Sequence, residues 1–401
     1  MNVSIQPRHL RGSIAAIPSK SAAHRLLICA ALADRETKIS CPTLSKDIEA
    51  TATCLRALGA GISYEAGVFN VSPIKEVNKN AMLDCGESGS TLRFLLPVVC
   101  ALGGGARIKM HGRLPQRPLS PLWEELEEHG AILSRPTEDI IAVGGSLSAG
   151  AYSIRADISS QYVSGLLFAL PILEGASSLE LVGNIESAAY IEMSRQAQEI
   201  FGLCPDFDGR KFEIPAEAKY LSPGDAFVEG DWSNAAFWIA ANVLSGGGLE
   251  VSGLRADSLQ GDKAVVKLIE EIGRGNAIVD VKDVPDLVPI LSVVAAVSPG
   301  ITEFINGARL RIKESDRIAS VCRMLSSLGI ECEEKAEGLV VHGGKLRGAT
   351  VDGANDHRIV MSAAVAAIAC SEPVTILGAQ AADKSYPAFF EDYKKLGGKI
   401  L

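Results

Sequence analysis

The sequence predicts an α/β protein with two similar domains, each made of three repeated units. A helical run that ends in Leu-Gly or a close variant recurs six times, and glycine in this place is typical of a helix C-terminus. A short strand rich in β-formers recurs as well. Both patterns return about every 70 residues, with one shorter interval of roughly 55 in the fourth unit, which indicates an internal repeat. The helical runs end at Leu58-Gly59, His129-Gly130, Phe201-Gly202, Ile272-Gly273, Leu328-Gly329 and Leu396-Gly397.

Each unit is expected to run strand, helix, strand, helix and then hairpin. Six such units exceed one ordinary domain, so two domains of three units are the economical arrangement. The chain opens with a strand at 3–5 and is expected to cross between the domains at 11–19 and again at 222–225, so that the two crossings form a two-stranded hinge. The recurring strands are expected at 37–40, 106–110, 178–182, 249–252, 301–305 and 374–377.

These crossings predict a discontinuous domain of residues 1–18 plus 226–401 and an inserted domain of residues 19–225. The cleft between two hinged domains is the expected place for a ligand, since closure excludes water.

Composition excludes several classes of partner. The chain has 401 residues, 47% of them hydrophobic, and a net charge of −9, so we expect no nucleic-acid partner and no acidic membrane surface. The longest apolar runs are too short to span a bilayer, and no apolar segment of a signal peptide is visible. Against this acidic background, local groups of Lys and Arg become informative.

Cysteine and histidine usage predicts no metal site. The nine cysteines contain no C-x-x-C pair, and the six histidines form no H-x-x-H motif. A disulfide framework is poorly supported too, and a reduced, cytoplasmic location fits.

A charged hexamer, Ile312-Lys313-Glu314-Ser315-Asp316-Arg317, precedes an apolar-periodic run that predicts a helix. Ser315 or an adjacent acid is expected in its first turn. Lys313 and Arg317 lie four residues apart, so on a helix they would share a face, and an anion at the helix N-terminus would offset their repulsion. Glu314 beside them is able to move a proton. Taken alone, the hexamer is more typical of a solvated helix start.

The first helix repeats this theme. Ser19 or Ser21 is its expected cap, and both follow Pro18. Lys20 and Arg25 bring two cations to the positive end of the helix dipole, which favours a bound anion there. A P-loop is excluded because Ser19 stands where that motif needs its second glycine. A capped helix with surface cations is an equally good interpretation.

Two loops and a third helix start add polar groups. The Gly/Ser/Thr loop 84–93 lets backbone approach a phosphate or carboxylate, and the prolines of loop 112–119 pre-shape a segment that holds Arg117. Ser159 and Ser160 exceed what one cap needs, so a hydroxyl remains for a ligand. Ordinary exposed loops and redundant capping explain the same residues about as well.

Three further helix starts complete the set. Asp286 precedes an apolar run, where an acid is usually a cap. Asn355 or Asp356 is the expected cap of the next such run, with Arg358 beside it, and Lys384 stands before the last helix. In all, at least five helix starts carry a Lys or Arg in or beside the first turn, against the usual preference for acids. Their repetition predicts that several helix N-termini converge on a strongly anionic ligand.

These motifs, in this order, resemble the 5-enolpyruvylshikimate-3-phosphate (EPSP) synthase family of enolpyruvyl transferases, from Lys20 to Lys384. The most specific segments are 310–317, 355–358, 86–93 and 20–25. The resemblance implies two domains of three βαβαββ units each, an inside-out α/β barrel. It implies transfer of the enolpyruvyl group of phosphoenolpyruvate to the 5-hydroxyl of shikimate 3-phosphate, with release of phosphate, on the shikimate pathway to chorismate. It also implies no cofactor and a monomer.

The same resemblance implies roles for individual residues. Asp286 corresponds to the acceptor of the hydroxyl proton, and Glu314 to the proton donor for the methylene carbon, with a tetrahedral adduct between the two steps. The expected shikimate 3-phosphate residues are Lys20, Ser21, Arg25, Ser159, Ser160, Gln161, Ser187, Asp286 and Lys313, with Tyr190 close by. The expected phosphoenolpyruvate residues are Lys20, Gly89, Arg117, Gln161, Arg317, Arg358 and Lys384. Lys20 is expected in the catalytic set as well.

Two positions depart from the family pattern. Glu87 stands where many members have Asn in the glycine-rich loop, and Arg309 stands where some have an Asn that contacts the shikimate phosphate. Neither residue is therefore assigned to a substrate.

Three alternatives compete with this interpretation. A UDP-N-acetylglucosamine enolpyruvyl transferase would carry a reactive Cys in the loop before Arg117-Pro118, and the loop has none. A phosphometabolite-binding protein without activity would need the cations but not both Asp286 and Glu314. An RNA 3′-phosphate cyclase, built from related units, would need a basic stripe that the acidic chain lacks.

Overall fold

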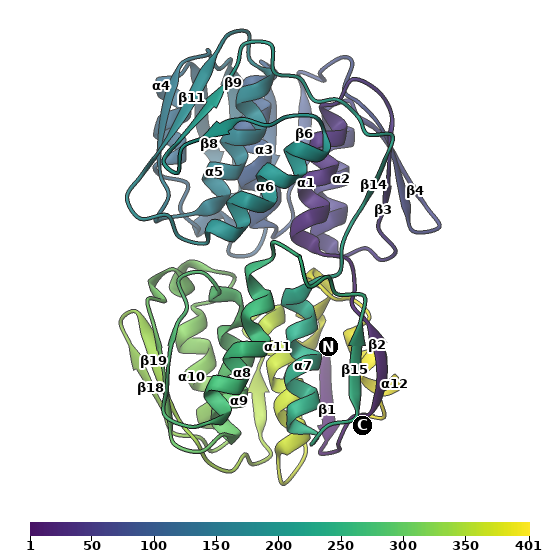
Figure 1. Ribbon diagram of the computed structural model, residues 1–401, viewed down its shortest axis with the longest axis vertical. Coiled ribbons are helices and arrows are strands. Elements are labelled where there is room, and N and C mark those ends of the chain that lie inside the picture. Colours follow the sequence, from purple (N-terminus) through teal and green to yellow (C-terminus); the bar gives the residue numbers. More distant parts are fainter. The chain divides into compact units, whose positions relative to one another are not determined.

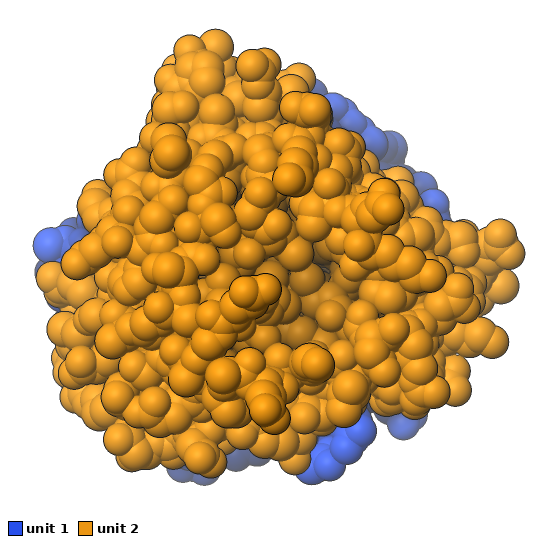
Figure 2. All heavy atoms as spheres, turned by 90° about the horizontal axis from the view of Figure 1, so that it is seen from above, with its two compact units in different colours: residues 1–17, 230–401 blue, residues 18–229 orange.

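The computed structural model describes all 401 residues, which divide into two compact units. Unit 1 comprises Met1–Ile17 and Gly230–Leu401, and unit 2 comprises Pro18–Glu229 (Figure 2). Each unit has its own hydrophobic core. The α/β fold class predicted from the sequence is confirmed.

Unit 2 contains three repeats. The first comprises α1 (Lys20–Ala31), β3 (Thr37–Ser40), α2 (Lys46–Leu58), β4 (Gly61–Glu65) and β5 (Val68–Ser72). The second comprises β6 (Ala81–Asp84), α3 (Gly89–Ala101), β7 (Ala106–Lys109), α4 (Leu122–Glu128), β8 (Ala131–Thr137) and β9 (Ile140–Gly145). The third comprises β10 (Ala151–Arg155), α5 (Ser160–Ala169), β11 (Ser177–Val182), α6 (Ala188–Ile200), β12 (Asp206–Phe207) and β13 (Lys211–Ile214). β14 (Asp225–Phe227) then returns to pair in parallel with β3 and completes the first sheet.

All three sheets of unit 2 share one pattern. Two strands pair in parallel, and one of them also pairs antiparallel with the last strand of the hairpin. The strand order β6-β7-β9-β8, in which the helix α3 connects β6 to β7, is an example. Leu83, Ile108 and Ile141 stand at equivalent places on three neighbouring strands and are fully buried, while the adjacent Arg107 is exposed. This alternation of buried and exposed residues is the two-residue period of a half-buried strand.

Three helices fill the centre of unit 2. α1, α3 and α5 are buried over most of their length, and α3 packs along α5 (Figure 1). Helices that are apolar on all sides are stable only when they are covered on all sides. The sheets therefore lie outside the helices, as the resemblance implied.

Unit 1 contains the other three repeats. The fourth comprises β2 (Gly12–Ala15), α7 (Trp232–Leu244), β15 (Leu249–Ser252) and α8 (Val265–Gly273). The fifth comprises β16 (Ala277–Asp280), α9 (Val288–Val297), β17 (Ile301–Ile305), α10 (Arg317–Ser327), β18 (Cys332–Lys335) and β19 (Gly338–His342). The sixth comprises β20 (Thr350–Asp352), α11 (His357–Ala366), β21 (Val374–Leu377), α12 (Phe389–Lys395) and β22 (Lys399–Ile400). The N-terminal strand β1 (Asn2–Gln6) pairs antiparallel with both β21 and β22 and completes the sixth sheet.

The fourth repeat has no hairpin. α8 ends at Gly273 and β16 begins at Ala277, so the chain enters the fifth repeat directly. This accounts for the shorter interval in the sequence. β15 consequently pairs only with β2, in a two-stranded sheet, whereas the other five sheets have four strands each. An apolar groove with a cavity volume of about 420 Å³ runs along β15, between α7 and Val266 of α8.

No helix in the chain has both the length and the apolar character that crossing a membrane requires.

Candidate active site

Arg317 is the centre of a dense ion-pair cluster in unit 1. Its guanidinium is 1% exposed and contacts three carboxylates: Asp286 at 2.6 Å, Glu314 at 2.6 Å and Asp356 at 2.9 Å. Burial alone would lower the pKa of Arg317, but the charges of Asp356, Glu314 and Asp286 raise it well above its usual value. A buried cation is stable only when it is paired, and these three acids pair it.

Asp356 anchors the cluster because it is the N-cap of α11. Its Oδ1 accepts from the backbone N–H of Arg358 at 3.0 Å, and its Oδ2 accepts from the hydroxyl of Ser315 at 3.0 Å. Burial would raise the pKa of Asp356, but the charge of Arg317 lowers it. The expected cap at 355–356 therefore also holds the key arginine, a role that the sequence pattern did not indicate.

The helix after the charged hexamer begins later than expected. Asp316 is its N-cap and accepts from the backbone N–H of Ala319 at 3.1 Å, so α10 starts at Arg317. The prediction that Lys313 and Arg317 share a helix face is wrong, because Lys313 is an extended residue outside the helix. The two cations nevertheless meet at one group: Lys313 lies 3.5 Å from Asp286. Its partial burial lowers the pKa of Lys313 to about 8.

Asp286 is not a helix cap, contrary to the usual role of an acid at that place. It lies in a 3₁₀ turn, Pro285–Leu287, ahead of α9, and no side chain caps either helix. Its carboxylate instead contacts three cations, since Arg358 lies 3.2 Å away in addition to Arg317 and Lys313. Arg358 also donates to the Ser233 hydroxyl at 2.7 Å and to the backbone carbonyl of Asp286 at 3.0 Å.

Asp262 lies behind this group and was not expected from the sequence. It is 2% exposed, and neither carboxylate oxygen has a hydrogen bond of good geometry, although the Ser233 hydroxyl lies nearby and opposes the rise in its pKa. Burial, and then the negative charge of Asp286, raise the pKa of Asp262 to about 6.

Lys384 approaches the same turn from the sixth repeat. It stands before the last helix, α12, as predicted, but it ends a 3₁₀ helix, Ala379–Lys384, and does not lie in the first turn of α12. Its ammonium donates to the backbone carbonyl of Asn355 at 2.6 Å, next to the cap of α11. The structure therefore brings Asp286, Lys313, Glu314, Arg317, Arg358 and Lys384 to one region of unit 1.

A second cationic group forms in unit 2 at the start of α1. Ser19 is the cap, and its hydroxyl accepts from the backbone N–H of Ala22 at 3.3 Å. Lys20 forms an ion pair with Asp47 at 2.9 Å. Arg25 is 2% exposed and lies over the ring of Phe94, 5.0 Å from its centroid. Burial lowers the pKa of Arg25 to about 10.

The contacts of Arg25 join it to two other predicted residues. It donates to the backbone carbonyl of Ser21 at 2.7 Å and to that of Tyr190 at 2.8 Å. Ser187, three residues earlier, is the N-cap residue of α6, but it has a left-handed backbone (φ 54°) and its side chain makes no cap hydrogen bond. A serine held in this conformation indicates a constraint beyond helix capping.

Gly89 lies between two arginines. A Cβ at this position would stand 2.6 Å from a guanidinium nitrogen of Arg93 and 2.7 Å from one of Arg117. Arg93 donates to Gln161 at 3.2 Å, and the Gln161 amide donates to Ser90 at 2.9 Å. The structure therefore brings Gly89, Arg117 and Gln161 together. Arg93, which ends the Gly/Ser/Thr loop, is a member of this cluster that was not assigned from the sequence.

The remaining predicted residues occupy the start of α5. The hydroxyl of Ser159 caps the helix by accepting from the backbone N–H of Gln161 at 3.3 Å, and Ser160 is buried in the first turn. Of the two departures from the family pattern, Arg309 donates to the backbone carbonyl of Lys282 at 2.6 Å, and the carboxylate of Glu87 lies against Gly112.

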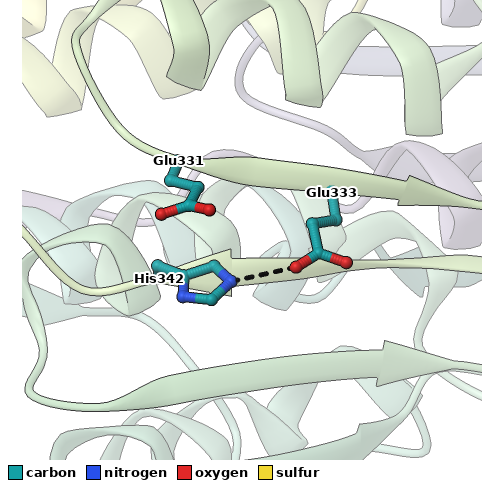
Figure 3. Close-up of side chains that lie close together, drawn as sticks. All are labelled: Glu331, Glu333 and His342. Carbon is teal, nitrogen blue, oxygen red and sulfur yellow. Dashed lines mark hydrogen bonds and ion pairs between the residues drawn. The ribbon is translucent and has the colours of Figure 1, made fainter.

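A group of possible metal ligands lies apart from these residues, on the hairpin of the fifth repeat. Glu331, Glu333 and His342 point toward one another from β18 and β19 and the turn before them (Figure 3). His342 lies 3.3 Å from Glu333, and Lys335 pairs with the same carboxylate at 2.8 Å. These ion pairs explain the group as surface electrostatics, so we assign no metal to it.

The chain has the fold of solved enolpyruvyl transferases. It superposes on EPSP synthase from Acinetobacter baumannii with a TM-score of 0.81, 24% sequence identity and coverage of 100% of this chain and 99% of that one. The enolpyruvyl transferase NikO from Streptomyces tendae gives a TM-score of 0.77 at 17% identity, with coverage of 100% of this chain and 98% of that one. Both likenesses concern the fold alone.

The sequence comparisons define the family. The model of EPSP synthase (3-phosphoshikimate 1-carboxyvinyltransferase) matches residues 5–393. The 3-phosphoshikimate 1-carboxyvinyltransferases of Clostridium kluyveri and Clostridium acetobutylicum are each 39% identical, over 99% of this chain and 98% of their own length. The chain belongs to the EPSP synthase family, as its motifs predicted.

Proposed function

We propose that the chain transfers the 1-carboxyvinyl group of phosphoenolpyruvate to the 5-hydroxyl of shikimate 3-phosphate and releases phosphate. This is the shikimate-pathway step that leads to chorismate and the aromatic amino acids. Family membership supports the reaction. The observation that carries it is the cluster in which one buried arginine, Arg317, holds both Asp286 and Glu314 at 2.6 Å.

We assign shikimate 3-phosphate to the residues that the family resemblance implies. Arg25 supports this assignment because its guanidinium is buried at the start of α1 yet remains cationic at neutral pH. Ser187 supports it through its left-handed backbone. The full set is Lys20, Ser21, Arg25, Ser159, Ser160, Gln161, Ser187, Asp286 and Lys313, with Tyr190 beside Arg25.

We assign phosphoenolpyruvate to Lys20, Gly89, Arg117, Gln161, Arg317, Arg358 and Lys384. Guanidinium groups bind carboxylate and phosphate through paired hydrogen bonds, so three arginines suit a ligand with both groups. Gly89 supports the assignment because it leaves room for Arg117 beside the first turn of α3. The two substrates bring roughly five negative charges, and this many cations are needed to offset them.

The surroundings of the two carboxyl groups suit opposite roles. Asp286 contacts Arg317, Arg358 and Lys313, and three cations favour the ionised form that accepts the hydroxyl proton. Glu314 contacts Arg317 at 2.6 Å. A substrate anion that binds Arg317 would compete with Glu314 for that guanidinium. Glu314 would then hold a proton more tightly and donate it to the methylene carbon, and phosphate would leave the tetrahedral adduct.

Three further proposals accompany the reaction. The chemistry is proton transfer and charge stabilisation by side chains, so it needs no cofactor and no metal. We propose a monomer, as the family resemblance implies, and a cytoplasmic location, which the cysteine usage supports. Lys20 joins the catalytic set because its ammonium, which lies 2.9 Å from Asp47, would stabilise charge on both substrates.

The test is phosphate release with phosphoenolpyruvate plus shikimate 3-phosphate, beside phosphoenolpyruvate plus UDP-N-acetylglucosamine. We expect release with the first pair only. Release with the second pair only would assign a different acceptor. No release with either pair, from folded protein that still binds shikimate 3-phosphate, would support a binding protein without activity.

A further inference from the structure

Two cysteines of the fifth repeat lie in direct contact. Cys322 is on α10 and Cys332 begins β18, and their sulfurs are 3.0 Å apart. β18 packs against α10, so both backbones are already held side by side. Both cysteines are reduced. Because the sulfurs of a disulfide lie about 2 Å apart, these two need to approach by only roughly 1 Å to bond.

The surroundings of the pair suit thiol chemistry. Cys332 is partly exposed, which gives a small reagent access, and Cys322 is 7% exposed. The Cys332 thiol donates to Cys322, and this hydrogen bond lowers the pKa of the Cys322 thiol. Burial and the charge of Glu334 oppose this shift, and the positive charge of Arg311 favours it, so the net lowering comes from the hydrogen bond between the two thiols. The thiolate is the reactive form, so these contacts favour reaction at this pair.

The other cysteines show why this pair is distinct. Cys54 and Cys85 also contact each other, in unit 2, but both are fully buried and burial contributes to raising the pKa of Cys85. Cys204 is exposed, but it has no neighbouring cysteine with which to form a bond. Only the pair on α10 and β18 combines contact with exposure.

We propose that Cys322 and Cys332 form a reversible disulfide by exchange with a low-molecular-weight disulfide. The Cys322 thiolate attacks one sulfur of the reagent, the reagent S–S bond breaks, and one thiol is released. Cys332 then loses its proton to solvent and attacks Cys322 in the mixed disulfide, which releases the second thiol. In balance, two cysteine thiols are oxidised by two electrons, and one external disulfide is reduced to two thiols.

The pair adjoins the segment that holds Lys313 and Glu314. Arg311 bonds Asp316, the cap of α10, at 2.9 Å and Glu334, two residues after Cys332, at 2.8 Å. A disulfide would add a covalent link between the same two elements, α10 and β18, that this ion-pair network already connects. This redox modification lies beside the hexamer and is independent of the proposed reaction.

The experiment treats the folded full-length protein with glutathione disulfide, blocks the remaining thiols with N-ethylmaleimide, and maps peptides by mass spectrometry without reduction. We expect one cross-linked peptide pair that joins Cys322 to Cys332, two hydrogens lighter than the separate peptides and absent after dithiothreitol. Cys204 should carry glutathione instead.

Two variants control the result. Cys204→Ser should leave the cross-link unchanged, and Cys332→Ser should abolish it and leave a glutathione adduct or a free thiol at Cys322. The wild-type map decides the question even if Cys332→Ser fails to fold. Recovery of Cys322 and Cys332 as two separate thiols or adducts, while Cys204 is fully modified, would overturn the proposal.

Discussion

In the ion-pair cluster of unit 1, the carboxyl groups of Asp286 and Glu314 lie among several cations but have different neighbours. Arg317 is 1% exposed and is shared between three acids, while Asp286 is shared between three cations. Removing one member of such a network leaves a buried charge without its partner, which is costly. Substitutions that keep shape and remove only charge are therefore the most informative.

The roles of Asp286 and Glu314 can be tested with amides of the same shape. We expect Asp286→Asn and Glu314→Gln each to lower kcat by about 10²–10⁴-fold, the usual contribution of a positioned acid or base. Steady-state phosphate release measures this. Glu337→Gln, at an exposed turn outside the cluster, should keep wild-type turnover. If both cluster variants kept near-wild-type turnover, the assignment would be wrong.

A substitution at Gly89 tests whether the absence of a side chain there positions the guanidinium of Arg117. In Gly89→Ala the new methyl group would stand within 2.7 Å of guanidinium nitrogens of Arg93 and Arg117, so both long side chains must move. We expect the fold to persist and the KM for phosphoenolpyruvate to rise about tenfold, the cost of one weakened charged hydrogen bond. Gly273→Ala, at a helix position with open space, is the matched control. An unchanged KM would separate Gly89 from phosphoenolpyruvate.

Asp262 predicts a pH dependence of stability. In the folded state Asp262 keeps its proton up to about pH 6, whereas in the unfolded chain it loses the proton near its ordinary pKa of 3.8. The free energy of unfolding therefore falls as pH rises from about 4 to about 6, and above pH 6 no further loss occurs. The total is about 3 kcal/mol. Asp262→Asn removes this loss. Relative to wild type, the free energy of unfolding of the variant should therefore rise by about 1 kcal/mol between pH 5 and pH 8.

Urea unfolding at the two pH values measures this difference. Asp280→Asn, at an exposed position, is the control and should show no such gain. A difference between Asp262→Asn and wild type that is the same at both pH values would mean that Asp262 is already ionised at pH 5.

At the scale of elements, the sequence predicted the repeats and most helix starts, because both depend on local patterns. The caps at Ser19, Ser159 and Asp356 follow directly from residue type. Asp286 shows the limit of such reasoning. Its contact with Arg358 joins residues 72 apart in the chain, and no periodicity reports a contact of that range.

In unit 1, two site residues that the sequence did not assign come from the same repeat. Ser233 and Asp262 belong to the fourth repeat, yet they act on Arg358 or Asp286, which belong to other repeats. Lys313 also lay outside the expected helix, because a 3₁₀ turn precedes it. Short 3₁₀ segments have no strong sequence signature, so the local path of the chain there depends on packing.

At the scale of the whole molecule, the two units differ in how the chain builds them. Unit 2 is a continuous segment, Pro18–Glu229, and its three sheets are complete. Unit 1 needs the first 17 residues, since β1 lies between β21 and β22 and β2 is the only partner of β15. A unit missing a central strand leaves unpaired backbone groups and an open core.

This difference predicts which fragments fold. We expect residues 18–229 to unfold cooperatively in urea and residues 230–401 to aggregate. Joining residues 1–17 to 230–401 by a short glycine linker should restore a cooperative transition, because the carbonyl of Ile17 accepts from the N–H of Asp231 at 2.8 Å. Circular dichroism and urea titration compare the three. Equal stability of 230–401 with and without residues 1–17 would contradict the prediction.

The fourth repeat shows which part of the repeated unit is dispensable. Its two strands and two helices form without a hairpin. Each of the other five sheets has two further strands, which in the sixth sheet are β22 and the N-terminal β1. The hairpin is thus an addition to a smaller βαβα unit. In the fourth repeat, which lacks it, an apolar groove lies along β15 where a hairpin would pack. The turn 274–276 is where the other repeats carry their hairpin, so we expect inserted sequence there to be tolerated, with the site residues of α9, α10 and α11 left in place.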